Sequence, residues 1–357
     1  SASGETIIIE GTSPIIDQGS TKIGVVIDNT YTQNIPVGRT FGEVLGAAGG
    51  SQGDLYGVSF GGSTSLENVY IVEGLNTTDP AKGFLSTNLP NEFVQETEVI
   101  TGGYNAEFGR STGGVINVLT KSGSNVFSGS VWADYTPGPL VADEKPSPRE
   151  GSSIDRINEL VYTTAIGAEL GGPIVKDKLW FHVGMNPQLS GFDIHRTISQ
   201  LVDTDNDGVA DTDENGFSVR DEVDRRTLKS TSRTIFFTGK LTGAVAPEHQ
   251  GSLSIFGNPG TADDYQSVTG IVNGQAYDQK VGAYDAAAKW TSKLNNNNTQ
   301  VDAVAGFHRN INDTLPTAAA DTYMVRFDGI RPLESYGMYE EMNGGHAVPD
   351  ECIQQGD

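Results

Sequence analysis

From residue 122 onward, the chain contains long stretches in which apolar and polar side chains alternate one by one. Val131, Ala133 and Tyr135 fall on one side of the first stretch. Ser130 and Asp134 fall on the other side. Successive side chains of a β-strand point to opposite faces of its sheet, so this period of two predicts strands with one apolar face. The predicted strands cover 125–136, 160–171, 178–190, 230–243, 251–258, 279–294 and 299–313.

The connections between these predicted strands alternate between short and long. The short ones read GPIVKD, AVAPEHQ and NNNN, and the long ones cover roughly 137–159, 191–229 and 259–278. All short turns then fall at one end of the sheet and all long loops at the other, which is typical of barrels in the bacterial outer membrane. The alternative is a secreted β-sandwich, although a sandwich has no reason to separate its loops by length.

The composition excludes some classes of protein. The 357 residues include 46 acidic and 23 basic side chains, and the formal net charge of −23 would repel the phosphates of a nucleic acid. No apolar run approaches the roughly 20 residues of a membrane-spanning helix, whereas alternating barrel strands need no such run. The single cysteine, Cys352, cannot form a disulfide within the chain. In an oxidising compartment its partner would lie on another chain or after Asp357.

The first 121 residues read differently, as a small mixed α/β domain. The β-branched runs ETIIIE, IGVVID, VYIV and GGVINVLT predict short strands. Thr40, followed by Glu43 three residues later, predicts the start of a short helix. The pairs Gly61-Gly62 and Gly113-Gly114 predict tight turns, because glycine adopts backbone conformations that other residues avoid.

Two segments of this domain resemble the plug of TonB-dependent outer-membrane transporters, more narrowly the Oar-like group. They are VYIVEGL at 69–75 and EFVQETEVITGGYNAEFGRSTGGVINVLTKSG at 92–123. In the family, a strand ending in an acidic-Gly turn precedes an E-x-V-x-x-G strand and a GGVINxxTK segment that leads into the first barrel strand. The sequence departs from the family at Glu73, where Asp is usual, and at Phe60-Gly61, which replace an Arg-Gly pair. We therefore carry over no arginine contact.

This resemblance, which spans most of residues 5–135, implies a mixed α/β plug domain at 1–121 followed by an antiparallel transmembrane β-barrel. Residues 122–357 would supply the first seven or so strands of a barrel of about 22 strands. An open sheet edge is not tolerated in lipid, so the remaining strands would come from downstream sequence or a second fragment. The long connection at 191–229 would then lie outside the cell.

The resemblance also implies a function and partners. The function is active transport of an unidentified substrate across the bacterial outer membrane, energised by the TonB complex, with no enzymatic activity. The implied surroundings are outer-membrane lipid and, as in some relatives, a surface lipoprotein. The alternative function, from a different class, is a secreted calcium-binding β-rich adhesin or binding module.

The segment ETIIIEG at 5–11 resembles a TonB box. Such a segment would bind TonB by adding a strand to a sheet edge, which needs main-chain hydrogen bonds and little side-chain specificity. The same residues also fit an ordinary first strand of the plug, and the box would then lie in sequence before Ser1. The candidate residues are Glu5, Thr6, Ile7, Ile8, Ile9, Glu10 and Gly11.

The segment DTDNDGVADTDE at 203–214 fits the pattern of a calcium-binding loop. Its alternating carboxylates can converge on one hard cation, and Gly208 permits the sharp turn between them. No helix pair flanks the segment, so we expect an isolated calcium loop that stiffens an external connection, and the alternative is an acidic loop that binds no ion. The predicted ligands are Asp203, Asp205, Asp207, the carbonyl of Val209, Asp211 and Glu214.

Other motifs carry less information. The run GVSFG at 57–61 matches the nucleophile elbow of hydrolases, but neither the buried strand nor the helix that the elbow requires flanks it. The five histidines have no zinc-ligand spacing. The three tryptophans fit either an aromatic belt at the membrane interface or ordinary packing in a sheet. The histidines are His182, His195, His249, His308 and His346, and the tryptophans are Trp132, Trp180 and Trp290.

Overall fold

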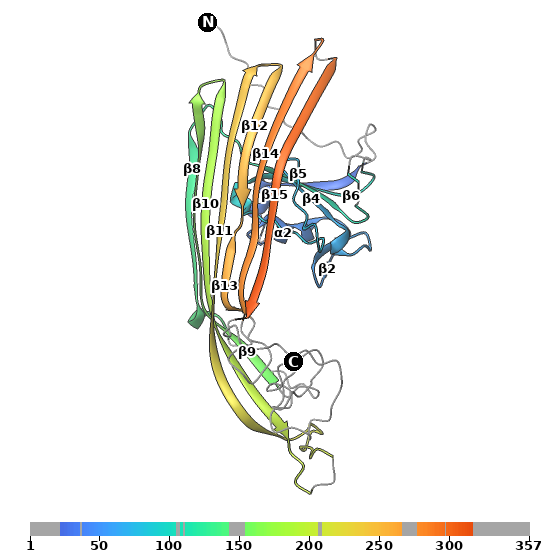
Figure 1. Ribbon diagram of the computed structural model, residues 1–357, viewed down its shortest axis with the longest axis vertical. Helices are drawn as coiled ribbons and strands as arrows, with labels where there is room; N and C mark the ends of the chain where they lie inside the picture. Colours follow the sequence, from blue (N-terminus) through green and yellow to red (C-terminus); the bar gives the residue numbers. More distant parts are fainter. Residues whose placement is uncertain are drawn as a thin grey trace, which may run out of the picture.

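The structure is a computed structural model in which an N-terminal domain lies against one face of a broad sheet of long strands (Figure 1). We call this domain, up to residue 121, the plug domain, and the sheet the wall. The TonB-box candidate at 5–11, Asp207, His346 and Cys352 lie outside the described residues. The structure describes residues 22–35, 38–104, 108–109, 111–142, 154–205, 209–265, 277–296 and 298–316.

The plug domain is built on a five-stranded sheet with the order β1-β6-β7-β4-β5, in which only β4 and β7 run parallel. These strands are β1 (Ile23–Asp28), β4 (Val69–Val72), β5 (Leu75–Asn76), β6 (Val94–Gly102) and β7 (Val115–Thr120), and β2 (Ser51–Asp54) pairs with β3 (Gly57–Phe60) in a separate hairpin. The helices are α1 (Asn29–Asn34), α2 (Phe41–Val44) and the short 3-10 helices η1 (Leu45–Ala47), η2 (Ser65–Glu67) and η3 (Asn91–Phe93). Thr40 and Glu43 form the predicted capping box at the start of α2.

The apolar core joins the plug domain to the wall. Phe41, Val72 and Ile116 are fully buried between the sheet and helices of the plug, and each such side chain contributes about 1.5–3 kcal/mol to folding. Phe256 and Ala287 belong to the same buried cluster, although both lie on wall strands. The two parts therefore share one core.

The wall is an antiparallel sheet whose strands follow one another in sequence order. The strands at 249–257 and 260–265 together occupy one position, between the strands at 220–246 and 277–294. They are separate because Asn258 and Pro259 interrupt the ladder, and proline has no N–H to donate. The strands are β8 (Ser128–Pro137), β9 (Ile154–Val175), β10 (Leu179–Leu201), β11 (Arg220–Ala246), β12 (His249–Gly257), β13 (Gly260–Tyr265), β14 (Tyr277–Leu294) and β15 (Thr299–Pro316), and η4 (Gly138–Leu140) follows β8.

The register assigns one face of the wall to the plug domain and the other to the outside. Lys240, Ser254 and Ala287 pair across β11, β12 and β14 and face the plug domain. The next row, Leu241 with Leu253, faces away. Apolar side chains on this outward face remain exposed, with 81% of Val131, 57% of Ile166 and 61% of Phe307 accessible. A sheet that exposes its apolar face and covers its polar one is arranged for lipid.

The strands β9, β10 and β11 are longer than the sequence predicts. The stretch at 191–229 is predicted as one loop, but it is strand up to Leu201 and again from Arg220, so the connection is 202–219. On β10 the alternation continues beyond Ser190, with Phe192 and Ile194 on one side and Asp193 and His195 on the other, but Ile194 is buried on the plug-facing side, so the apolar side is no longer the outward one. Pairs such as His195 with Glu159 occupy this part.

The three tryptophans do not form one belt. Trp290 lies on the outward face and is 43% exposed. Trp132 faces the plug domain and packs edge-on against Phe93, with ring centroids 5.9 Å apart. Trp180 lies in the plug-facing row and donates its indole N–H to Asn125 at 2.8 Å. None of the helices within the described residues has the length and apolarity needed to cross a bilayer.

Candidate functional site: the contact between plug and wall

The turn between β4 and β5 brings an acidic side chain to the wall. Val72 pairs with Leu75, so Glu73 and Gly74 form a two-residue turn. Both have positive φ, 53° and 75°, as in a type I′ hairpin turn. Glycine suits this conformation, whereas a glutamate there costs about 1 kcal/mol or more. The cost indicates that the Glu73 side chain gains compensating interactions.

Glu73 is held by an ion cluster that crosses from the plug to the wall. Its carboxylate is 1% exposed and accepts hydrogen bonds from the backbone N–H and the hydroxyl of Thr120, at 2.7 and 2.8 Å. Lys240 Nζ on β11 lies 2.8 Å from one carboxylate oxygen, and Lys289 Nζ on β14 lies 3.5 Å from the other. Lys240 also donates to the carbonyl of Thr120 at 3.1 Å. We call Glu73, Lys240 and Lys289 the Glu73 cluster.

The electrostatics of this cluster keep Glu73 charged. Burial alone would raise the pKa of the Glu73 carboxyl, but Lys240, Lys289 and the Thr120 N–H outweigh it and lower the pKa below the ordinary 4.5. Two ammonium groups face one carboxylate, so the cluster carries a net positive charge. Gly74 leaves the space that Lys289 occupies, since a Cβ at that position would lie 2.8 Å from Lys289 Cε.

A second polar contact joins the plug segment after β5 to β14 and β15. Asp285, which is 4% exposed, accepts from the Thr87 hydroxyl at 2.6 Å and lies 2.5 Å from Nδ1 of His308. The other ring nitrogen of His308 is 3.2 Å from the Ser86 hydroxyl. Asn310 donates its amide to Asp79 at 2.5 Å. This contact is therefore a hydrogen-bonded network rather than an apolar seam.

A third contact lies on the same face of the wall at β8 to β10, near the edge opposite β15. Glu169 is 2.7 Å from Lys121 Nζ at the end of the plug domain and 3.2 Å from Nε2 of His182 on β10. The absence of a side chain at Gly184 admits the Phe93 ring, which a Cβ there would meet. The plug domain is thus bound through polar groups across the whole width of the wall, in addition to the apolar core that it shares with Phe256 and Ala287. The polar part of this contact can be exchanged for water at lower cost than the apolar part.

The described part of the predicted calcium loop does not gather its ligands. Asp211 accepts hydrogen bonds from the backbone N–H of Thr204, at 3.1 Å, and from the Thr204 hydroxyl. Asp213 closes a tight turn by accepting from the backbone of Asn215 and Phe217. Among the described residues, no group of three or more His, Cys, Asp or Glu side chains is placed to hold a metal. Asp207 lies outside those residues, so the site remains a prediction.

The hydrolase motif at 57–61 forms no active site. Ser59 lies on β3, is 5% exposed and donates to the carbonyl of Gln52 on β2 at 3.1 Å. No histidine contacts it among the described residues. The sequence did not predict the Glu73 cluster or the role of Asp285. The one sequence signal for the Glu73 cluster was the glutamate itself, at a position where the family usually has aspartate.

The comparisons with known proteins point to one family. No protein-family model matches the chain. Over 269 residues, or 72% of the chain, it is 45% identical to the TonB-dependent transporter Oar of Myxococcus xanthus. The match covers 25% of that protein, so the chain spans about a quarter of the length of this relative.

Two solved structures show weaker similarity. The siderophore receptor PirA from Acinetobacter baumannii is 13% identical with a TM-score of 0.34, covering 82% of this chain and 58% of that one. FpvA of P. aeruginosa, solved with an iron pyoverdine, is 12% identical with a TM-score of 0.42, covering 80% and 41%. These TM-scores are too low to support an inference about this chain.

The sequence match and the architecture agree. A plug domain lies on the polar face of a sheet whose apolar face is exposed, in the order that the resemblance implies. Relatives of this kind are transporters and not enzymes, which excludes the hydrolase interpretation, and no finding supports an adhesin. The chain is a protein of the bacterial outer membrane and belongs to the family of TonB-dependent transporters.

Proposed function

We propose that this protein is an active transporter whose plug domain closes the lumen of a barrel and moves relative to the wall when TonB pulls on it. The Glu73 cluster is the observation that carries this proposal. A buried ion pair adds little net stability, but it fixes one arrangement, since separating the partners leaves a charge without compensation. The cluster therefore specifies a closed position for the plug, and the polar contacts around it allow that position to be left.

The movement is testable without knowledge of the substrate. Thr87 is fully buried where the plug domain meets Asp285, so a cysteine there reports on separation. In the full-length protein with Cys352→Ser, we expect Thr87→Cys to react with a membrane-impermeant maleimide in energised cells and to be protected in cells that lack TonB. Leu55→Cys, at a position that is 85% exposed, should react in both. Equal protection of Thr87→Cys with and without TonB would contradict the proposal.

The segment at 5–11 is proposed as the point at which TonB binds. Strand addition needs the backbone N–H groups of the segment, and proline removes one of them. Ile8→Pro should therefore weaken binding of the TonB periplasmic domain to the purified protein in a titration, while Ala2→Pro should not. Unchanged binding would show that the box lies elsewhere and would leave the proposal of plug movement standing.

The loop at 203–214 is proposed to bind calcium outside the cell. The spacing of its carboxylates supports this, and an extracellular site needs an affinity of only about 10⁻⁴–10⁻³ M. Bound calcium would neutralise carboxylates that otherwise repel one another and would stiffen the tip of the connection between β10 and β11.

A further inference from the structure

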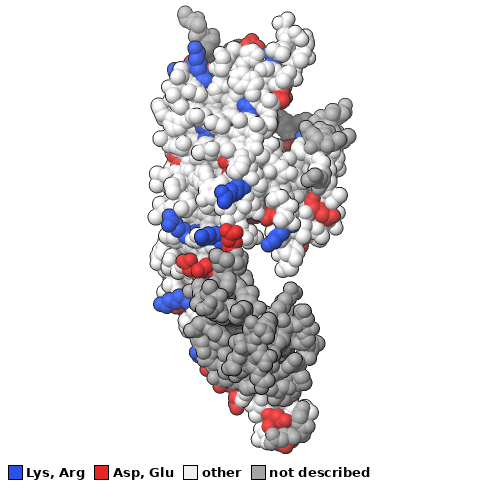
Figure 2. Space-filling model, viewed as in Figure 1, with Lys and Arg blue, Asp and Glu red and all other residues white. Residues whose placement is uncertain are grey.

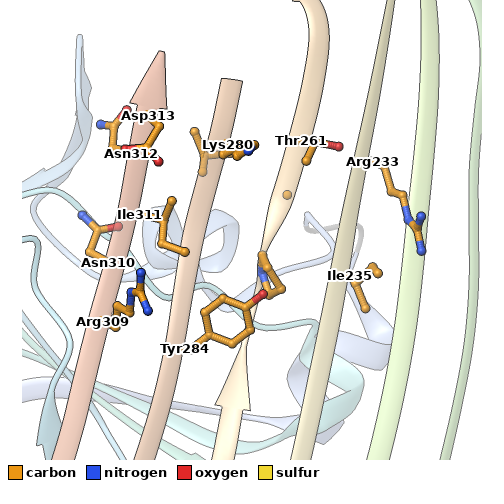
Figure 3. Close-up of a pocket in the computed structure, with 13 residues that line it drawn as sticks. Arg233, Ile235, Thr261, Lys280, Tyr284, Arg309, Asn310, Ile311, Asn312 and Asp313 are labelled. Carbon is orange, nitrogen blue, oxygen red and sulfur yellow. The ribbon is translucent and has the colours of Figure 1, made fainter. Parts of the chain in front are cut away.

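The outward face of the wall, opposite the plug domain, contains a cavity of about 570 Å³. Residues of β11, β13, β14 and β15 line it, and Figure 3 shows Arg233, Lys280, Tyr284 and Arg309 around a common space. This cavity is separate from the contact between plug and wall, and nothing in the transport cycle accounts for it.

The register places the charged lining residues on the outward face. Arg233 pairs with Thr261, Thr261 with Lys280, and Lys280 with Asp313, which makes one row across four strands. Arg233 lies eight residues from the outward-facing Leu241 on β11, with no shift of register between them, so both side chains face the same way. Arg309 pairs with Tyr284 on the same face, and the pair Gly282 with Ile311 lies between this row and that of Lys280.

The cavity is basic in a chain whose formal net charge is −23. Within the part of the chain that the structure describes, Arg233, Lys280 and Arg309 form no ion pair, unlike Lys121, Lys240 or Arg225. Asp313 is the one carboxylate in the lining, so three cations and one anion leave a net charge of +2. Unpaired cations that share a concave site attract an anion.

The cavity also has an apolar side. The Tyr284 ring packs near Phe237 with centroids 6.1 Å apart, and Ile235 and Ile311 line the same space. From the cavity toward the end of the wall with the short turns, the outward face continues through the exposed side chains of Ile255 and Phe307. In Figure 2, charged side chains are sparser over the upper part of this face, and Lys and Arg gather beneath it together with Asp and Glu. The cavity therefore lies where the apolar band ends.

We propose that this cavity binds the phosphate-bearing headgroup of an outer-leaflet glycolipid, with its acyl chains along the apolar band. Two of the strands that line it, β13 and β15, end within a few residues, at Tyr265 and Pro316, while β11 continues to Arg220, and long connections leave the sheet at that end. In an outer-membrane barrel this end is external, where lipid phosphates lie. Arginine forms paired hydrogen bonds to phosphate oxygens, and Lys280 adds a third charge. A ligand with both a phosphate and acyl chains matches both sides of the cavity.

Binding of bisphosphorylated lipid A to the purified full-length protein in detergent, followed by native mass spectrometry, tests this proposal. The triple variant Arg233→Gln, Lys280→Gln, Arg309→Gln should bind the lipid about 100-fold more weakly, at about fivefold per cation removed. The matched control Lys176→Gln, Lys178→Gln, Lys293→Gln removes the same charge at the opposite end of the wall and should bind normally. These positions are all exposed, so both variants should fold.

Two further probes decide the source of the phosphate. Lipid A without its phosphates should bind the wild-type protein and the triple variant equally weakly. Inorganic phosphate in the millimolar range should compete only slightly, because it makes no use of the apolar side. Equal binding of bisphosphorylated lipid A by wild type and triple variant, or binding of inorganic phosphate without the lipid, would overturn the proposal. The measurement involves no TonB, so its failure would leave the proposed transport function untouched.

Discussion

Replacing Glu73 by glutamine is the sharpest test of the contact between plug and wall. Glu73→Gln keeps the size of the side chain and an oxygen for the Thr120 N–H but removes the negative charge. Lys240, whose side chain is 9% exposed, then loses its ion-pair partner in a site closed to water. Breaking a buried ion pair costs about 3–5 kcal/mol, and the lower end applies because Lys289 is 28% exposed and keeps contact with solvent.

Amide hydrogen exchange at Thr120 reports this loss directly, because its N–H donates to Glu73 at 2.7 Å. A loss of about 3 kcal/mol corresponds to roughly 100-fold faster exchange, at about 1.4 kcal/mol for each factor of ten. Glu222→Gln provides the control, because its ion pair with Arg225 is exposed and its loss should leave exchange at Thr120 unchanged.

A double variant separates the charge effect from other consequences of the substitution. Lys240→Met combined with Glu73→Gln removes the uncompensated charge and should restore much of the protection at Thr120. Unchanged exchange in Glu73→Gln, or a double variant that exchanges faster than the single one, would refute the reasoning that the charge pair fixes the plug.

The remaining predictions concern acid, lipid contact and calcium. Because folding lowers the pKa of Glu73 below 4.5, the contribution of its charge to the stability of the plug is complete above about pH 4.5 and is lost as the pH falls through the lowered pKa. Protease cleavage of the plug should therefore increase in that acidic range, and it should increase less steeply in Glu73→Gln. In variants with a single tryptophan, lipids with brominated acyl chains should quench Trp290 and not Trp132, and equal quenching would contradict the assignment of faces. Calorimetric titration of the wild-type protein should show calcium binding at millimolar concentration or below, and the double variant Asp203→Asn, Asp205→Asn should raise the Kd at least about tenfold. The absence of binding heat in the wild-type protein would contradict the proposal that this loop binds calcium.

The alternation of side chains identifies the wall from sequence because a strand between lipid and a polar lumen must alternate. The side of the first strand that contains Val131 and Tyr135 is the outward face, and the side with Ser130 and Asp134 faces the plug. The prediction stops where the apolar side changes face. Ile194 on β10 shares the face of the plug-facing His182 and is 2% exposed, whereas Asp193 and His195 lie on the other side. A prediction that keeps the apolar side outward therefore ends near Ser190.

The plug contacts could not be predicted, because they join residues far apart in the chain. Glu73 and Lys240 are separated by 167 positions, and each has an ordinary neighbourhood in sequence. From the sequence alone, a lysine on the lumen-facing side of a strand cannot be distinguished from the other polar residues of the wall. Only the three-dimensional position of the β4–β5 turn, set by the parallel pairing of β4 with β7, brings the two charges together.

The great length of β10 and β11 makes the outermost part of the molecule a stiff arm (Figure 1). From Phe192 to Leu201, β10 rises roughly 30 Å and pairs with β9 and β11. No irregularity interrupts β11 between Ser230 and Lys240. One strand thus joins the outer arm, where the β10–β11 ladder shifts register once between Ile198 and Ser199, to Lys240, which holds Glu73 of the plug domain.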